Sequence, residues 1–382
     1  MTETIFATDV AALDAADPLA HFRGRFHLRE GLITSWLEAL WSTAPRRIGD
    51  KIGRLIGANP GEIVASDSTS VNIFKALTAA LSLRRERTVI LSEATNFPTD
   101  VYMMQGIEAF SGGRVKAATV APDDIVEALN DDVAVLLLTQ VHYKSGRVRD
   151  MAAITRAAHD AGALVVWDLS HSAGAIPVDL NGANADFAIG CGYKFLNGGP
   201  GAPAYLFAAA RHHGATPVLS GWFGHARPFD FEEDYDPAAG IERFQCGTPP
   251  VLGLSALEVG VDLMLEADMA EIRRKSLALG DLFIEQMRPL CEAYGFELIS
   301  PEDHATRGSQ VAYAHPQGYQ IVQALKEYDV IADFRAPDIL RFGLTPLYLR
   351  YRDIVETVDR LETVCATRAW DKPQYHQRAA VT

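Results

Sequence analysis

The middle of the chain alternates short apolar runs with amphipathic segments. Residues 133–139 (VAVLLLT) and 163–167 (ALVVW) are almost continuously hydrophobic, which is typical of strands buried on both faces of a parallel sheet. Residues 149–160, between them, have apolar positions at helical spacing. A strand, a helix and a second strand in this order form a βαβ unit with a right-handed connection. The pattern predicts an α/β fold with a mostly parallel sheet.

Further elements follow from the same periodicity. Short apolar runs predict strands at residues 63–65, 88–92, 185–190, 203–207, 296–299 and 310–314. Apolar residues at helical spacing predict helices at residues 33–41, 46–56, 71–81, 251–267 and 269–294. With 382 residues the chain is long enough for one large domain and a smaller one.

Composition narrows the classes of function. Thirty-five basic and 49 acidic residues give a net charge of −14, which argues against a nucleic-acid or anionic-membrane partner. No apolar run approaches a membrane span, and residues 1–22 contain no Lys or Arg, which a secretory signal would place before its apolar core. We expect a cytoplasmic protein.

The four cysteines are widely scattered along the chain. They are Cys191, Cys246, Cys291 and Cys365. Their spacing fits no metal-binding motif, so we expect no metal site and reduced, mostly structural thiols.

Two of the predicted strands deliver polar side chains to one edge of the sheet. Asp168 follows the run at 163–167, and Tyr193 and Lys194 follow the run at 185–190. Open α/β sheets bind ligands at the carboxyl ends of their strands. A lysine amine can hold the aldehyde of pyridoxal phosphate as a Schiff base, and a carboxylate keeps the pyridine nitrogen protonated. Taken alone, this spacing leaves a structural role open, with Asp168 capping a turn and Lys194 solvated.

A candidate anion site lies near the start of the predicted sheet. Asp67, Ser68, Thr69 and Ser70 directly precede the helical pattern at 71–81. Hydroxyls and free backbone N–H groups at a helix start can bind a phosphate. An ordinary helix N-cap, which Ser and Asp also favour, is the alternative.

Several motifs together resemble the kynureninase family of fold type I pyridoxal phosphate enzymes. They are DSTSVN at 67–72, NFPTD at 96–100, DLSHSAGA at 168–175, GYKFLNGGPG at 192–201, GWFGH at 221–225 and RFGLTPLY at 341–348. They occur in the family's order and span most of the chain. The resemblance implies an aspartate aminotransferase-like fold, in which a large domain with a mostly parallel sheet carries a smaller α+β C-terminal domain. We therefore expect an N-terminal arm with helices (1–58), a large cofactor-binding domain (59–262) and a small domain (263–382).

The resemblance also implies an activity, the hydrolysis of the Cβ–Cγ bond of L-kynurenine to anthranilate and L-alanine. Lys194 would hold pyridoxal 5′-phosphate and move the Cα proton, and Asp168 would keep the ring protonated. Tyr193 would lie at the phosphate and is a reasonable proton donor after bond cleavage. Another type I enzyme, such as a cysteine desulfurase or an aminotransferase, and a relic that only binds cofactor remain alternatives.

The family's cofactor contacts map onto further positions of this chain. The residues expected there are Thr69, Ser70, Phe97, Asp100, Thr139, Asp168, His171, Tyr193, Lys194, Trp222 and Thr248. Phe97 would stack on the pyridine ring, although a place in the core beside Pro98 is the alternative. Trp222 and Thr248 would reach the phosphate region across a subunit interface, so the resemblance implies a homodimer with shared active sites.

Two residues are expected to bind the substrate. Arg341 matches the family position that clamps the substrate carboxylate, a task suited to the guanidinium fork, whereas Arg335 is expected at the surface. Trp41 is expected to pack on the aryl ring. Family members that favour 3-hydroxykynurenine have His and Asn where this chain has Trp41 and Thr248, so plain kynurenine is the expected substrate.

One region departs from the family pattern. The family follows its FHL opening with a YLDGNSLG loop and a helix, but here residues 26–31 (FHLREG) run almost directly into residues 32–36 (LITSW). We expect this apparent deletion to leave cofactor binding nearly normal, and to weaken, alter or abolish kynurenine turnover, because small errors in positioning strongly reduce rates.

Overall fold

The computed structural model describes residues 15–18, 20–25, 40–215 and 217–377. The chain forms two compact units, residues 1–43 and 44–382. The first unit contains the short 3-10 helix η1 (Ala20–Arg25). The second unit contains all the elements described below. Most of the predicted helix at 33–41 and the apparent deletion after Gly31 lie outside the described residues.

A seven-stranded sheet forms the centre of the second unit. Its strands are β1 (Ile63–Ala65), β2 (Val89–Glu93), β3 (Lys116–Val120), β4 (Val133–Thr139), β5 (Leu164–Asp168), β6 (Phe187–Cys191) and β7 (Ala204–Ala208). Their order is β1-β7-β6-β5-β4-β2-β3. The five strands from β6 to β3 are parallel to their neighbours, whereas β7 is antiparallel to both β6 and β1. This confirms the predicted α/β fold with a mostly parallel sheet.

The buried strands are those with continuous apolar sequence. Every residue of β4, β5, β6 and β7 is buried, as expected for strands covered by helices on both faces. The edge strand β3 (KAATV) is largely exposed. Its weakly apolar sequence gave no signal for a strand.

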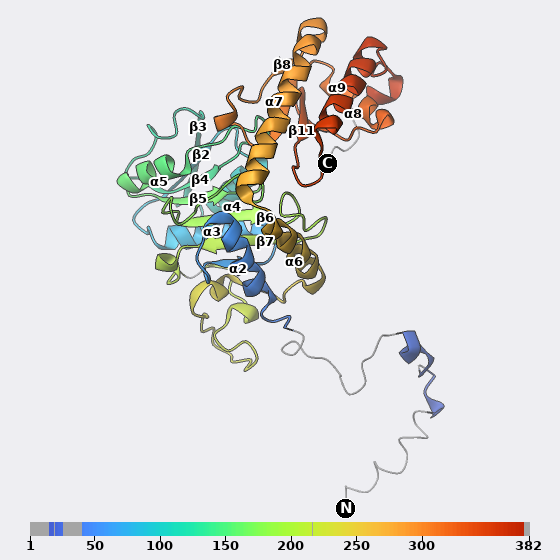
Figure 1. The fold of residues 1–382 in the computed structure, drawn as a ribbon. Coiled ribbons are helices and arrows are strands. Elements are labelled where there is room, and N and C mark those ends of the chain that lie inside the picture. Colours follow the sequence, from blue (N-terminus) through green and yellow to red (C-terminus); the bar gives the residue numbers. More distant parts are fainter. Residues whose placement is uncertain (1–14, 19, 26–39, 216, 378–382) are drawn as a thin grey trace, which may run out of the picture. The chain divides into compact units, whose positions relative to one another are not determined.

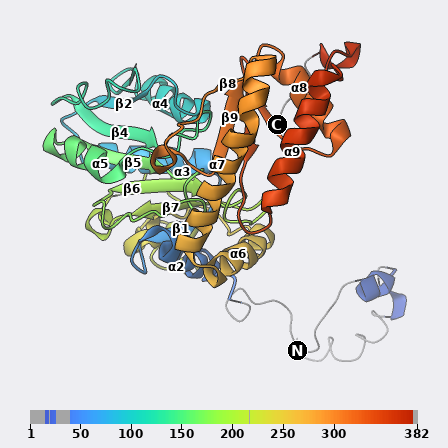
Figure 2. The same ribbon diagram turned by 45° about the horizontal axis from the view of Figure 1, so that its top comes forward.

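Helices cover both faces of this sheet (Figure 1, Figure 2). They are α2 (Ala44–Ile56), α3 (Thr69–Ser82), α4 (Pro98–Phe110), α5 (Met151–Asp160) and α6 (Val251–Glu266). Residues of α2, α5 and α6 share one core cluster with the sheet, and residues of α3 and α4 share another. The two clusters are the two faces of the sheet, since successive strand residues point to opposite sides.

The C-terminal part forms a smaller α+β layer. Its antiparallel sheet has the order β10-β11-β9-β8. Its elements are α7 (Met269–Tyr294), β8 (Glu297–Leu298), β9 (Gln310–Ala314), α8 (Gly318–Leu325), β10 (Asp333–Arg335), β11 (Ile339–Gly343) and α9 (Tyr351–Ala366). Helix α7 contributes Ile272 to the large-sheet core and Leu279 to the small-sheet core, so it links the two layers. The domain boundaries at 58 and 262 stay a prediction.

The register of the parallel strands gathers polar residues at one edge. Thr139, the last residue of β4, pairs with Asp168, the last residue of β5, and Asp168 pairs with Ile189 of β6. The loop after β6 carries Tyr193 and Lys194. The predicted site residues therefore share the carboxyl edge, where ligands bind in such sheets. Among the described residues, no helix is long and apolar enough to cross a membrane.

Gly260 lets α6 approach the loop that follows Lys194. A Cβ atom at Gly260 would lie 2.4 Å from the carbonyl oxygen of Leu196. We expect Gly260→Ala to lower the free energy of unfolding by about 1–3 kcal/mol, because overpacking forces backbone apart. Gly106→Ala on α4 is the matched control: a Cβ atom there would have no atom within 4 Å apart from its neighbours along the chain and the backbone of its own helix, so this change should raise stability by about 0.5–1 kcal/mol. Denaturant unfolding measures both, and a neutral Gly260→Ala would contradict the close packing.

Candidate active site

A cavity of about 680 Å³ opens at the carboxyl edge of the large sheet. Most of the predicted site residues line it, namely Thr69, Ser70, Phe97, Asp100, Asp168, His171, Tyr193, Lys194 and Thr248. They come from the N-terminus of α3, the start of α4, the end of β5, the loop after β6 and the turn before α6. The fold thus brings together residues that are far apart in the sequence.

The amine of Lys194 lies among aromatic and imidazole groups. Its Nζ atom is 3.3 Å from Nε2 of His171. It lies 6.0 Å from the ring centre of Phe97 and 5.7 Å from that of Tyr193. The amine is therefore held over the cavity, between the side chains expected to contact the cofactor.

Two buried carboxyl groups lie in the same cavity. Burial raises the pKa of Asp168, while the backbone N–H of Ser170, which donates to Oδ1 over 2.7 Å, and the charge of Lys194 oppose this rise. The pKa of Asp100 is raised well above its usual value, first by burial and then by the charge of Asp168. Both shifts favour the neutral carboxyl, and the shift is larger at Asp100, so Asp168 is the better placed of the two to carry charge.

Thr139 and Asn96 hold Asp100 in place. The hydroxyl of Thr139 donates to Oδ1 of Asn96 and lies 3.5 Å from Oδ2 of Asp100. Thr139 does not itself line the cavity, so its predicted contact with the cofactor stays a prediction. Its observed partners place it one layer behind Asp100.

His171 is neutral and has a defined tautomer. Burial, followed by the charges of Lys194 and Arg341, moves its pKa well below the usual value. Its Nε2 atom lies 3.3 Å from Nζ of Lys194 and 3.3 Å from Nη1 of Arg341. Because both neighbours are donors, Nε2 accepts and the ring proton is on Nδ1. That buried Nδ1 atom has no partner among the described residues.

Arg341 stands behind His171 on β11. Its Nε atom donates to Oδ1 of Asp333 over 3.1 Å, and its Nη1 atom donates to the carbonyl of Tyr143. Arg335, expected at the surface, is half-buried instead because Asp333 lies between the two arginines and also accepts from Nη2 of Arg335 over 3.2 Å. Nε and Nη2 of Arg341 both donate to the carboxylate of Asp333, so its fork is paired within the protein. Arg341 does not line the cavity, and its expected role in binding the substrate carboxylate stays a prediction.

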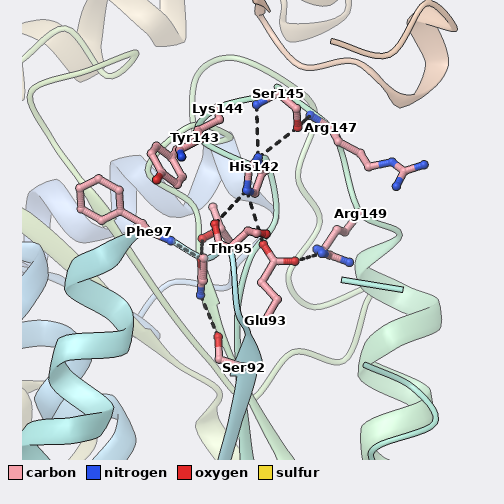
Figure 3. A network of polar contacts seen from close by, with 12 residues as sticks. Ser92, Glu93, Thr95, Phe97, His142, Tyr143, Lys144, Ser145, Arg147 and Arg149 are labelled. Atoms are coloured by element: carbon pink, nitrogen blue, oxygen red, sulfur yellow. Dashed lines mark hydrogen bonds and ion pairs between the residues drawn. The ribbon is translucent and has the colours of Figure 1, made fainter. Parts of the chain in front are cut away.

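A polar network lies beside the cavity (Figure 3). The Nε2–H group of His142 donates to the carbonyl of Thr95 over 2.9 Å. Its Nδ1 atom accepts from the backbone N–H of Ser145 over 3.2 Å. One imidazole therefore joins the turn that leads to Phe97 with the loop that contains Tyr143. The rings of Phe97 and Tyr143 meet edge to face, with centres 5.2 Å apart.

A buried ion pair lies next to His142 in this network. Glu93, at the end of β2, is fully buried and pairs with Arg149. Its Oε1 atom lies 3.8 Å from Nε2 of His142. Neither His142 nor Tyr143 was predicted as a site residue. The sequence places the loop after β4 at the same sheet edge as Asp168, but nothing in its local pattern marks His142 or Tyr143.

Four predicted residues do not line this cavity: Thr139 and Arg341, whose contacts are given above, and Trp222 and Trp41. Trp222 lines a separate hollow of about 380 Å³ together with His225 and Phe231. Trp41 belongs to the first compact unit, residues 1–43. The expected roles of both tryptophans stay predictions.

The residues around the cavity fit the predicted pyridoxal phosphate. The N-terminus of α3 presents Thr69 and Ser70 to the cavity, where free N–H groups favour a phosphate. The orphaned Nδ1 of His171 and Oδ1 of Asp100 are buried polar atoms that a polar aromatic ligand would satisfy. Lys194 would supply an amine for the aldehyde, and Asp168 would supply a carboxylate for the ring nitrogen.

Curated proteins similar to this chain are named kynureninase. The Pseudomonas fluorescens enzyme is 42% identical over 411 residues, covering 98% of this chain and 99% of its own. The Deinococcus radiodurans enzyme is 48% identical over 404 residues, covering 95% and 98%. The Burkholderia pseudomallei (strain K96243) enzyme is 47% identical over 359 residues, covering 92% and 86%.

The family model "Kynureninase C-terminal domain" matches residues 272–361. Solved structures with the same fold include the cysteine desulfurase CsdA from Escherichia coli, with a TM-score of 0.72 and 19% identity over 91% of this chain and 90% of that one. A C-DES mutant, described with glycine covalently linked to its PLP cofactor, has a TM-score of 0.71 and 17% identity over 95% and 93%. These likenesses confirm the predicted fold type.

The alignments also bear on the apparent deletion. The alignment with the Pseudomonas enzyme extends over 411 positions, whereas this chain has 382 residues. At least 29 aligned positions, the difference between 411 and 382, therefore face a gap in this chain. The predicted place of the missing piece, after Gly31, lies outside the described residues.

The neutral state of His142 makes the network sensitive to acid. Burial lowers the pKa of His142, against the bond to Thr95, so the folded state favours the neutral ring. The neutral His142 ring contributes fully to stability above the pKa of the residue in the unfolded chain, about 6.5. This contribution is lost as the pH falls through that value towards the lower pKa of His142 in the folded protein. We expect the unfolding midpoint to fall less between pH 7.5 and 5.5 in His142→Asn than in the wild type. Equal acid sensitivity would contradict the lowered pKa of His142.

Proposed function

Because this chain belongs to the kynureninase family, we propose that it hydrolyses the Cβ–Cγ bond of L-kynurenine, giving anthranilate and L-alanine, with pyridoxal 5′-phosphate as cofactor. The observation that carries this function is the placement of Lys194 and Asp168 in one cavity with the helix start at Thr69. An amine, a buried carboxylate and an anion-binding helix end are the three groups that this cofactor requires.

The roles of the residues follow from their surroundings. When bound, pyridoxal phosphate supplies an electron sink for the substrate carbanion. Lys194 binds the aldehyde and, once released, moves the Cα proton of the substrate. Asp168, buried and near Lys194, holds a proton on the ring nitrogen. Phe97 covers the ring, and Arg341 orients the substrate carboxylate from beside His171.

Bond cleavage requires water and a proton donor. Water adds to the substrate ketone, so the aryl fragment leaves as a carboxylic acid and the remaining Cβ atom needs a proton. Burial, ahead of the effect of Cys191, raises the pKa of Tyr193. The Tyr193 hydroxyl therefore keeps its proton at neutral pH and is the donor we propose for Cβ.

The other type I activities are not favoured. A desulfurase needs a mobile, nucleophilic cysteine facing the cofactor. Cys191 lines the cavity, but it lies on strand β6 and burial raises the pKa of its thiol, which disfavours the reactive thiolate. The high identity to kynureninases over nearly the full chain also separates it from aminotransferases.

A symmetric homodimer and a cytoplasmic location are part of this proposal. Leu252, Val259 and Leu263 on α6 are 89%, 72% and 49% exposed and share one face of the helix, a pattern that supports contact with a second copy. The expected places of Trp222 and Thr248 at that interface are part of the same proposal. The reduction in turnover expected from the missing loop also stays a prediction.

Replacing Lys194 tests the cofactor assignment directly. Lys194→Ala should abolish the visible absorption band of the lysine-bound cofactor and reduce kynurenine turnover to background, measured by anthranilate fluorescence. Lys144→Ala is the matched control, because Lys144 is bonded to the carbonyl of Ala336 outside the cavity and should keep the band. A band that survives in Lys194→Ala would overturn the assignment.

Substrate choice tests the expected roles of Trp41 and Thr248. In competition assays the protein should prefer kynurenine to 3-hydroxykynurenine, because an unpaired buried hydroxyl costs about 1–3 kcal/mol, or roughly 5- to 150-fold in kcat/KM. Thr248 lines the cavity, so Thr248→Asn should move the ratio towards the hydroxylated substrate. A native preference for 3-hydroxykynurenine would contradict both assignments.

A further inference from the structure

Two segments that are distant in the sequence border the phosphate end of the cavity. One is the turn at Asp67 that leads into α3, and the other is the turn that carries Thr248; both Asp67 and Thr248 line the cavity. The start of α3 is the part that would bind the phosphate of this chain's own cofactor, so its position matters most. Lys75 contacts both segments.

Lys75 is a fully buried lysine on α3. Its Nζ atom donates to Oδ2 of Asp67 over 2.5 Å and to the carbonyl oxygen of Phe244, 169 positions further along the chain, over 2.5 Å. A buried ammonium is costly unless it is paired and hydrogen-bonded. These two bonds therefore constrain the distance between Asp67 and the segment that contains Phe244.

Asp67 sets the direction of the turn that enters α3. Its backbone has a φ of 52°, the left-handed region that Asp tolerates better than most residues. Its carbonyl accepts from the N–H of Ala204 over 2.8 Å. The next residue, Ser68, is the N-cap of α3. Fixing the Asp67 side chain therefore fixes where the first N–H groups of α3 point.

The partner segment is held just as closely. Phe244 is fully buried, and the thiol of Cys246 lies 3.7 Å from Oδ1 of Asp67. Gly221 packs so tightly on this segment that a Cβ atom there would lie 1.9 Å from the carbonyl oxygen of Cys246. The turn before Trp222 is thereby attached to the same segment that leads to Thr248.

We propose that Lys75 is a positioning residue for the cofactor phosphate, which fixes the start of α3 by joining Asp67 to the segment at Phe244 without touching the cofactor. Lys75 is absent from the residues that line the cavity, so its effect passes through Asp67 and Phe244. The proposal rests on the cofactor assigned under the proposed function. A lysine that only stabilises the fold would affect every ligand alike.

The test compares two aldehydes that differ by the phosphate. Apoprotein is titrated with pyridoxal phosphate and with pyridoxal, and binding is followed by the visible band and by tryptophan fluorescence. Lys75→Met should bind pyridoxal phosphate about tenfold or more weakly, the scale seen when a residue that orients a binding group is removed. Its affinity for pyridoxal should stay within about twofold of the wild type.

Two further variants complete the experiment. Asp67→Asn breaks the same ion pair and should give the same selective loss, and it provides the measurement if Lys75→Met does not fold. Asp186→Asn is the control: Asp186 is buried and bonded to His159 and His212 at the opposite end of β6, so this variant should lose stability while keeping the ratio of the two affinities.

The outcomes separate the proposal from the function on which it rests. A wild type that binds neither aldehyde overturns the proposed function and this proposal together. A wild type that prefers the phosphorylated aldehyde, with variants at Lys75 and Asp67 that keep the same ratio, overturns the proposal alone. Equal losses for both aldehydes would also overturn it.

Discussion

The electrostatic attraction between Lys194 and the buried acids Asp168 and Asp100 is the interaction on which the rest of the site depends. Two carboxyl groups in one dry cavity cannot both ionise at low cost. The larger rise in pKa is at Asp100, which burial and the charge of Asp168 cause against the hydrogen bonds of Thr139 and Asn96, and this favours Asp168 as the group that carries charge. The parallel sheet makes this possible, because the register of β4 and β5 brings Thr139 beside Asp168.

Residues outside the cavity hold the segments that present the site residues. His142, Asp333 and Lys75 each occupy a buried or half-buried position and each bridges segments that present a site residue. Buried polar groups stabilise a fold only when all their hydrogen-bonding atoms have partners. The side chains that line the cavity are thus held by His142, Asp333 and Lys75, which determine the geometry of the site without contacting a ligand.

The sequence predicted those parts of the site that directly follow a strand with a clear apolar pattern. Continuous apolar runs located β4 and β5, and the polar residues after them, such as Asp168 and Lys194, could be placed at one edge. The resemblance to a known family added Phe97 and Arg341. Lys75 and His142 could not be found in this way, because a lysine in a helix and a histidine in a loop have no distinctive local pattern. Their importance arises from partners such as Phe244, which only the folded chain brings near.

The loop after β4 is anchored mainly through its backbone. The side-chain amide of Gln310 donates to the carbonyls of His142 and Tyr143, over 3.3 and 3.1 Å, and the hydroxyl of Ser300 donates to the carbonyl of Ser145 over 2.7 Å. Carbonyl groups are present whatever side chain a residue carries. The path of the loop beside Phe97 therefore depends on Gln310 and Ser300 of the C-terminal layer as well as on the side chain of His142, so a substitution in that layer can shift the loop without altering any residue of the loop itself.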